Sequence, residues 1–247
     1  MSRRFIAILS FAAAIGLSPH AGQAGFFSAS WPVATKAPAG EALISFKDSQ
    51  LAKAAAQRVW YTGAFEHFEY ARLETRDLVV EAVYDTIIGD QTILDYPHWM
   101  ESMIDTWNRN RGQSKSWGKS GRAQAWHGHI DYKLYRLQGA NQHCAGFNSE
   151  WDHSGRDSYG RPGKLFFGYM CAKAGETLTE NRVENILKGV TIDKRFGHRF
   201  VKPGQTASVD QAAVAIASGA AGSATGNHAF PFEFGTHHVE SGAGFGN

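Results

Sequence analysis

Two apolar, aromatic runs contain the chain's two cysteines: QHCAGFNSEW at residues 142–151 and KLFFGYMCA at residues 164–172. Their composition is typical of β-strands. Between them, residues 152–163 (DHSGRDSYGRPG) are dense in turn formers, which predicts an exposed loop. The runs therefore predict neighbouring strands that bring Cys144 and Cys171 together, with Cα atoms about 5 to 6 Å apart.

The first 24 residues have the features of a signal peptide. A positive start, Ser2-Arg3-Arg4, precedes an apolar stretch, and small residues precede a cleavage site after Ala24. We therefore expect export to the periplasm or the exterior, by either the general or the twin-arginine route. A single cysteine pair in an exported chain predicts a structural disulfide, because the Cys-x-x-Cys spacing of redox-active pairs is missing.

The remaining elements are predicted from hydrophobic periodicity and turn residues. We expect a flexible lead-in at 25–40, one domain at 41–202 and a disordered Gly/Ala/Ser-rich tail at 203–247. Within the domain we expect an Ala-rich helix at 48–59, a hairpin of strands 64–74 and 78–88, and a strand at 126–137. The second strand of the hairpin alternates in a way that predicts one buried face and one exposed face.

Two amphipathic helices complete the predicted domain. The first has an apolar stripe along residues 96–107 that predicts burial of Trp99, Met103 and Trp107, with Asp95 as its cap. The second begins after Thr179, a natural N-cap. The fold class expected is α+β, an antiparallel sheet packed against two amphipathic helices.

Composition and motifs exclude several functions. The net charge of +2 is too small to indicate a nucleic-acid partner. Motifs of serine hydrolases, nucleotide-binding proteins and zinc proteases are missing, and we expect no cofactor. No apolar run after the signal peptide is long enough to span a membrane.

A basic stretch at residues 108–125 suggests a ligand site. It holds no acidic residue and is expected to be an exposed loop. Positive side chains around a tryptophan suit an anionic or sugar-like ligand, through charge-assisted hydrogen bonds and stacking. The alternative is a solvated loop. The candidate ligand-binding residues are Arg111, Lys115, Trp117, Lys119 and Arg122.

A second hypothesis is a metal site at His127-x-His129-x-Asp131. On an extended strand these side chains share one face, and a His-x-His pair can bind zinc. The same face is also the one expected to meet solvent. Acid–base pairs are conceivable at Glu66-His67 with Glu69 and at Asp152-His153 with Asp157, although such clusters are common on surfaces.

The order Trp126-x-Gly-x-Ile-x-Tyr132, Cys144-x-Gly-Phe147 and Gly168-Tyr-x-Cys171-Ala, followed by a helix, resembles a group of exported or lipid-anchored bacterial proteins of unknown activity. The resemblance implies export and the cysteine pairing, and it carries no active site. Unlike the anchored members, this chain has no lipid-attachment cysteine.

We therefore expect a non-catalytic cell-envelope module that binds an anionic envelope polymer or lipid surface. The alternative is a metal-assisted hydrolase that uses His127 and His129.

Overall fold

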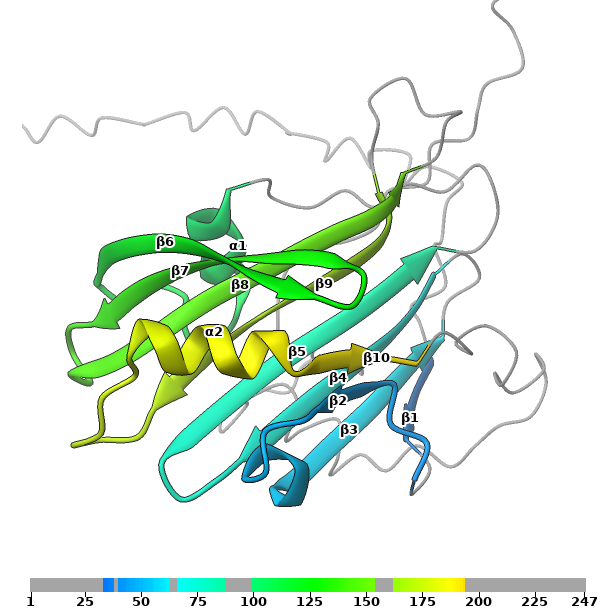
Figure 1. Cartoon of the computed structure of the whole chain (residues 1–247), viewed down its shortest axis with the longest axis horizontal. Helices are drawn as coiled ribbons and strands as arrows, with labels where there is room; N and C mark the ends of the chain where they lie inside the picture. The colour runs from blue at the N-terminus through cyan, green and yellow to red at the C-terminus, as the bar shows by residue number, and fades with distance from the viewer. Residues whose placement is uncertain (1–32, 38–39, 63–65, 88–98, 154–161, 194–247) are drawn as a thin grey trace, which may run out of the picture. The chain divides into compact units, whose positions relative to one another are not determined.

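The fold is built on one eight-stranded antiparallel sheet with the strand order β1-β3-β4-β5-β9-β8-β7-β6 (Figure 1). The computed structural model describes residues 33–37, 40–62, 66–87, 99–153 and 162–193. The strands of the sheet are β1 (Val33–Lys36), β3 (Ala55–Thr62), β4 (Glu66–Glu74), β5 (Leu78–Ile87), β6 (Lys115–Ala125), β7 (Gly128–Leu137), β8 (Gln142–His153) and β9 (Pro162–Ala172). A separate antiparallel pair joins β2 (Ile44–Phe46) to β10 (Val190–Ile192).

The expected α+β class is wrong. Strands take up 59% of the described residues and helices 14%, so the protein is mainly antiparallel β. Its described helices are α1 (Met100–Thr106), α2 (Glu180–Lys188) and the short 3₁₀ turn η1 (Leu51–Lys53). None of these helices is long and apolar enough to cross a membrane. The predicted lead-in, signal peptide and tail lie outside the described residues, apart from residues 33–37 and 40.

The Ala-rich helix predicted at residues 48–59 is the main local error. Its start forms η1, and the rest belongs to β3, which pairs with β1 and β4. Val59 at the end of the predicted helix and the next two residues of β3, Trp60 and Tyr61, are buried. Packing of these β-branched and aromatic side chains therefore overrides the weak helix propensity of the alanines.

The predicted hairpin of β4 and β5 is confirmed, but β5 is not half-exposed. Alternate residues of β5 belong to two different hydrophobic cores. One core includes Met103 and Ile104 of α1, and the other includes α2 and the β2–β10 pair. Both faces of the central strands are therefore covered, and all of β5 except Ile87 is buried.

The two helices differ in how well the sequence predicts them. Thr179 caps α2 as expected, since its Oγ1 accepts a hydrogen bond from the Arg182 backbone N–H at 3.3 Å. Met103 in α1 and Trp107 directly after it are fully buried, whereas Trp99 is 76% exposed, contrary to the prediction. Trp99 has an extended backbone and precedes the helix, so the helical stripe does not include it.

Glu69 attaches the small β2–β10 pair to the main sheet. Its carboxylate is fully buried and accepts four hydrogen bonds. The donors are the backbone N–H groups of Leu43 (2.9 Å) and Ile44 (3.0 Å), Nη1 of Arg58 (2.7 Å) and Nε1 of Trp60 (2.7 Å). A buried carboxylate needs hydrogen-bond donors of this kind, and these four commit Glu69 to the fold.

The disulfide between Cys144 and Cys171 is confirmed. The two residues are direct partners on the neighbouring strands β8 and β9. Their Cα atoms are 4.0 Å apart, closer than the 5 to 6 Å expected, because direct cross-strand partners approach more closely than most disulfide-linked residues.

Candidate functional site

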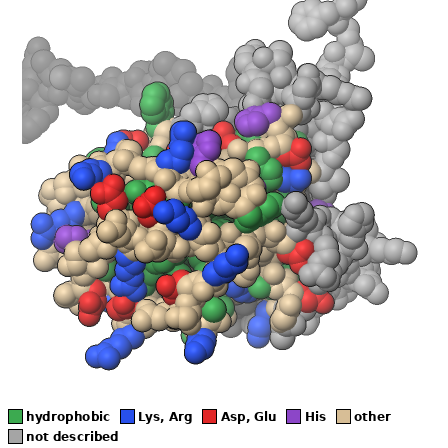
Figure 2. Space-filling model, in the orientation of Figure 1, with side chains coloured by type: hydrophobic (Ala, Val, Ile, Leu, Met, Phe, Trp, Pro, Cys, Tyr) green, Lys and Arg blue, Asp and Glu red, His purple; other side chains and the backbone are tan. Residues whose placement is uncertain are grey.

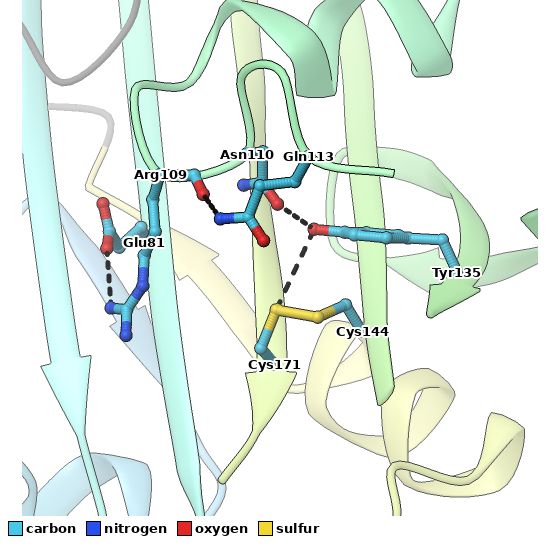
Figure 3. The surroundings of a disulfide bond; sticks show 7 residues. All are labelled: Glu81, Arg109, Asn110, Gln113, Tyr135, Cys144 and Cys171. Atoms are coloured by element: carbon cyan, nitrogen blue, oxygen red, sulfur yellow. Dashed lines mark hydrogen bonds and ion pairs between the residues drawn. A yellow bond between two sulfur atoms is a disulfide. The ribbon is translucent and has the colours of Figure 1, made fainter. Parts of the chain in front are cut away.

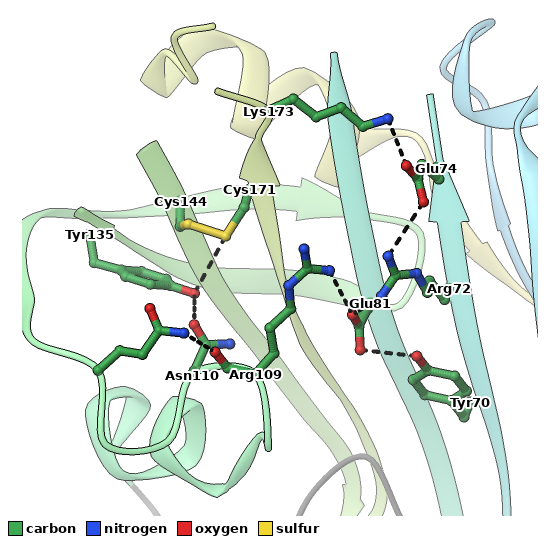
Figure 4. Close-up of polar contacts among 11 residues, drawn as sticks. Tyr70, Arg72, Glu74, Glu81, Arg109, Asn110, Tyr135, Cys144, Cys171 and Lys173 are labelled. Atoms are coloured by element: carbon green, nitrogen blue, oxygen red, sulfur yellow. Dashed lines mark hydrogen bonds and ion pairs between the residues drawn. A yellow bond between two sulfur atoms is a disulfide. The ribbon is translucent and has the colours of Figure 1, made fainter. Parts of the chain in front are cut away.

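A buried carboxylate, Glu81 on β5, is the centre of a polar cluster on the α1 side of the sheet (Figure 4). It accepts hydrogen bonds from the Tyr70 hydroxyl (3.0 Å) and from Nη1 of Arg72 (2.9 Å). Nη1 of Arg109 lies 3.7 Å from the same carboxylate. The strand periodicity predicts that Glu81 faces solvent, so the sequence alone does not reveal this cluster. The hairpin register, which makes Arg72 and Glu81 cross-strand partners, was the available signal.

The cluster extends into a chain of charges. Arg72 also forms an ion pair with Glu74 (3.4 Å). Glu74 in turn forms an ion pair with Lys173 (2.7 Å). This group of ion-paired side chains therefore has one excess positive charge. Its cations are Arg72, Arg109 and Lys173, and its carboxylates are Glu74 and Glu81. The hydrogen bond from Lys173 holds the pKa of Glu74 below its usual value.

The tyrosines of this cluster retain their protons. Burial, reinforced by the charge of Glu81, raises the pKa of Tyr70 well above its usual value. Burial and the same carboxylate also raise the pKa of Tyr135 and Tyr169. The cluster therefore orients charges and hydrogen-bond donors, and its tyrosines are poor general bases near neutral pH.

The turn that carries Arg109 is held against the disulfide (Figure 3). The fully buried Asn110 accepts a hydrogen bond from the Tyr135 hydroxyl at 2.9 Å, and this hydroxyl lies 3.9 Å from Sγ of Cys171. Within the turn, Nε2 of Gln113 donates to the backbone oxygen of Arg109 at 2.5 Å. The turn that carries Arg109 is thus held by two side-chain hydrogen bonds.

The guanidinium of Arg109 lies near the carboxylate of Glu81 and is partly exposed to solvent. Its side chain is 46% exposed, and its contact with Glu81 is longer than a hydrogen bond. Within the described part of the chain, no hydrogen bond occupies its N–H groups. An arginine of this kind can offer a planar fork of donors to a carboxylate or phosphate.

The predicted basic loop at residues 108–125 is mostly strand, since β6 begins at Lys115. The side chain of Lys115 is 4% exposed and contacts Asp105 at 2.5 Å and two backbone oxygens of the turn. The ring of Trp117 packs on that of Tyr135 with centroids 5.0 Å apart. Nζ of Lys133 lies 5.6 Å from the centroid of the Trp117 ring. Lys115 and Trp117 therefore serve the fold.

The other three predicted ligand residues lie at the surface, and each has a partner. Lys119 is 78% exposed and pairs with Glu180 at 3.4 Å. Arg122 is 63% exposed and pairs with Asp131 at 2.7 Å. Arg111 donates to the Thr106 backbone oxygen at 3.0 Å. Figure 2 shows positive and negative side chains interspersed over the visible face, so this face has no continuous basic patch.

The proposed metal ligands do not converge. His127 lies in the β6–β7 turn with Nε2 2.9 Å from Oγ of Ser149, and Asp131 pairs with Arg122. Among the residues with described positions, no group of three or more His, Cys, Asp or Glu side chains is placed to hold a metal ion. Nothing in this arrangement favours the metal-assisted hydrolase.

The contact between His127 and Ser149 was not predicted, and it does not form a nucleophilic pair. The Ser149 hydroxyl donates its proton to the His129 backbone oxygen at 2.7 Å. Nδ1 of His127 is buried and has no hydrogen-bond partner among the described residues, so no acid orients the ring. Burial, followed by the charge of His129, lowers the pKa of His127 to about 4.

The two acid–base pairs give no site either. Glu69 is saturated by its four donors, and burial lowers the pKa of His67 to about 4. Asp152 pairs with Lys164, and His153 is exposed. The side chain of Glu66 and the whole of Asp157 lie outside the described structure.

No protein-family model, curated protein or solved structure matches this chain. The resemblance to exported and lipid-anchored bacterial proteins therefore stays an expectation, and the case for a function rests on geometry.

Proposed function

We propose that the protein is an exported, non-catalytic cell-envelope module that binds an anionic polymer at the turn carrying Arg109 and Arg111. The observation that supports this proposal is the state of Arg109: its guanidinium is 46% exposed and lies 3.7 Å from the buried carboxylate of Glu81.

The buried carboxylate prepares Arg109 for a ligand without neutralising it. Glu81 shares its charge with Arg72, so it attracts Arg109 but does not occupy its donors. A preoriented side chain loses less conformational freedom on binding, which leaves more of the interaction energy for affinity. A carboxylate or phosphate group of the polymer would accept two parallel hydrogen bonds from this guanidinium.

The other exposed cations of the basic stretch have a supporting role. Arg111 is on the same turn and has partners of its own, and Lys119 and Arg122 lie on β6 and pair with Glu180 and Asp131. Such charges attract an anionic polymer at long range and are screened by salt. Lys115 and Trp117 are not part of the proposed site, because both side chains are packed into the fold.

Two observations support export and a non-catalytic role. The disulfide fits an oxidising compartment, in agreement with the predicted signal peptide. Two candidate catalytic groups among the described residues, Glu69 and Ser149, are committed to structural hydrogen bonds.

The test is binding of the mature protein to immobilised polyuronate at low and at high salt. We expect Arg109→Gln to weaken binding roughly tenfold, the loss of one charge-assisted contact of about 1.4 kcal/mol. Arg136→Gln is the matched control, because Arg136 is exposed and bonds to Asn141 elsewhere on the sheet. Equal loss in both variants would indicate a nonspecific charge effect and would contradict the proposal.

Two further arms identify other outcomes. Binding to phosphatidylglycerol vesicles in place of the polyuronate would assign the site to a lipid surface. Stoichiometric zinc in protein purified without a histidine tag, lost on replacing His127 and His129, would favour the metal-assisted hydrolase.

A further inference from the structure

An aromatic cluster lies at the tip of the β6–β7 hairpin, separate from the Arg109 turn. The rings of Tyr84 and Trp151 are stacked with centroids 5.7 Å apart. His127 lies 4.3 Å from the Trp151 ring, and Trp126 meets both His127 (4.9 Å) and Trp151 (6.5 Å) at steep angles. Tyr84 is the buried member of this cluster, and Trp126 is its most exposed member, at 40%.

The residues of this hairpin tip are unusual for a tight turn. Trp126 and His127 form the two-residue connection between the cross-strand partners Ala125 and Gly128. Such connections usually carry small or polar residues that tolerate positive φ, and here neither residue adopts it. A large ring that remains 40% exposed is unusual in such a connection, and its contacts with His127 and Trp151 hold it in place.

The cluster is rigid and carries no charge near neutral pH. Ser149 holds the His127 ring through a 2.9 Å hydrogen bond, and the Gln124 amide donates to the Gly128 backbone oxygen at 2.6 Å, which closes the turn. The burial that lowers the pKa of His127 to about 4 keeps this ring neutral. A ligand would therefore meet a fixed aromatic platform that loses little entropy on binding.

Two other ligand classes fit less well. An aromatic cage for an ammonium group needs open space between rings, each within about 6 Å of the cation. Here the His127 ring lies directly against those of Trp126 and Trp151, so such a space is filled. A protein interface of ordinary size needs about 800 Å² per partner, far more than one partly exposed indole provides.

From these observations we infer that the Trp126 platform is a binding site for the sugar rings of a β-linked glycan. The electron-rich face of an indole attracts the polarised C–H groups on the flat face of a β-linked pyranose. The site does not depend on Arg109, so it goes beyond the anion binding proposed above.

The test is titration of the mature protein with two neutral β-1,4-linked hexasaccharides, one of glucose and one of N-acetylglucosamine, followed by tryptophan fluorescence and calorimetry. We expect saturable binding of at least one hexasaccharide. Trp126→Ala should weaken this binding roughly tenfold, as expected for one stacking contact, and Trp126→Tyr should restore most of it. Near-ultraviolet circular dichroism checks that each variant is folded.

Trp99→Ala is the matched control, because Trp99 is the other exposed tryptophan among the described residues. Arg109→Gln should leave hexasaccharide binding unchanged, so the failure of either site is visible independently of the other. Absence of binding to both hexasaccharides would overturn the inference. Unchanged binding by Trp126→Ala, or an equal loss in Trp99→Ala, would overturn it as well, and the last result would point to nonspecific contacts of exposed indoles.

Discussion

Cys144 on β8 and Cys171 on β9 lie directly opposite each other, and their sulfur atoms are bonded. Both strands are interior to the sheet, and both cysteines are buried. The bond joins residues 27 positions apart in the sequence. A link of this span restricts the unfolded chain more than the folded one, and in the chain-entropy model it contributes about 3 to 4 kcal/mol to stability.

The first prediction follows from this link. The double variant Cys144→Ala with Cys171→Ala should lose about 3 kcal/mol of unfolding free energy in urea and keep its far-ultraviolet circular dichroism spectrum. Wild-type protein measured under reducing conditions separates the loss of the bond from the loss of sulfur volume. An unchanged urea midpoint in both samples would show that the bond is energetically neutral.

The second prediction contrasts two tryptophans near α1. Trp107 is fully buried, with its ring 5.2 Å from that of Tyr169 and 5.6 Å from that of Phe167. Trp107→Ala should therefore cost about 3 to 5 kcal/mol, through lost burial and the cavity that remains. Trp99→Ala should cost less than about 0.5 kcal/mol, because Trp99 is 76% exposed. Thermal unfolding of both variants checks this, and similar losses would contradict the assignment of the core.

Local features were predictable from the sequence. The β4–β5 hairpin follows from alternation on either side of a turn at residues 75–77, and the cap of α2 follows from Thr179 alone. Both depend on residues close together in the chain. The error at β3 has the opposite origin, because its conformation is decided by pairing with β1 and β4 and by packing of Val59 and Tyr61.

The candidate site was hidden for a related reason. Alternation along β5 places the Glu81 side chain on one face of the sheet. It does not reveal that α1 and the turn after α1 cover that face. The contact between Glu81 and Arg109 joins positions far apart in the chain, and so does the hydrogen bond from Tyr135 to Asn110. Composition indicates a basic stretch, but it does not show which side chains are exposed. Packing leaves the side chain of Arg109 partly exposed and buries that of Lys115.

The third prediction concerns close packing between β5 and β9. A Cβ atom added at Gly168 would lie 2.1 Å from the backbone oxygen of Glu81 and 2.8 Å from Cα of Ala82. Backbone atoms of a central strand cannot move aside cheaply, so Gly168→Ala should destabilise the fold by roughly 1 to 3 kcal/mol or more. Gly139→Ala is the control, since an added Cβ there meets nothing within 4 Å. Equal urea midpoints for the two variants would contradict this packing.

The last prediction is a loss of stability in mild acid caused in part by His127. In the folded protein, burial and then the charge of His129 lower the pKa of His127 to about 4, against about 6.5 in an unfolded chain. Above about pH 6.5 the ring is neutral in both states. Below it, the unfolded chain binds a proton that the folded protein does not, so stability falls as the pH drops toward 4.

Urea unfolding at about pH 7 and about pH 4.5 measures this loss, to which His127 should contribute roughly 2 kcal/mol. His127→Phe keeps a ring in the aromatic cluster but cannot be protonated, so its stability should fall less between the two pH values. The variant also loses the bond to Ser149, which should lower its stability near pH 7 by about 1 kcal/mol. His153→Gln, at an exposed position, controls for removal of a surface histidine. If His127→Phe and wild type lose equal stability between the two pH values, His127 is not a source of the acid sensitivity.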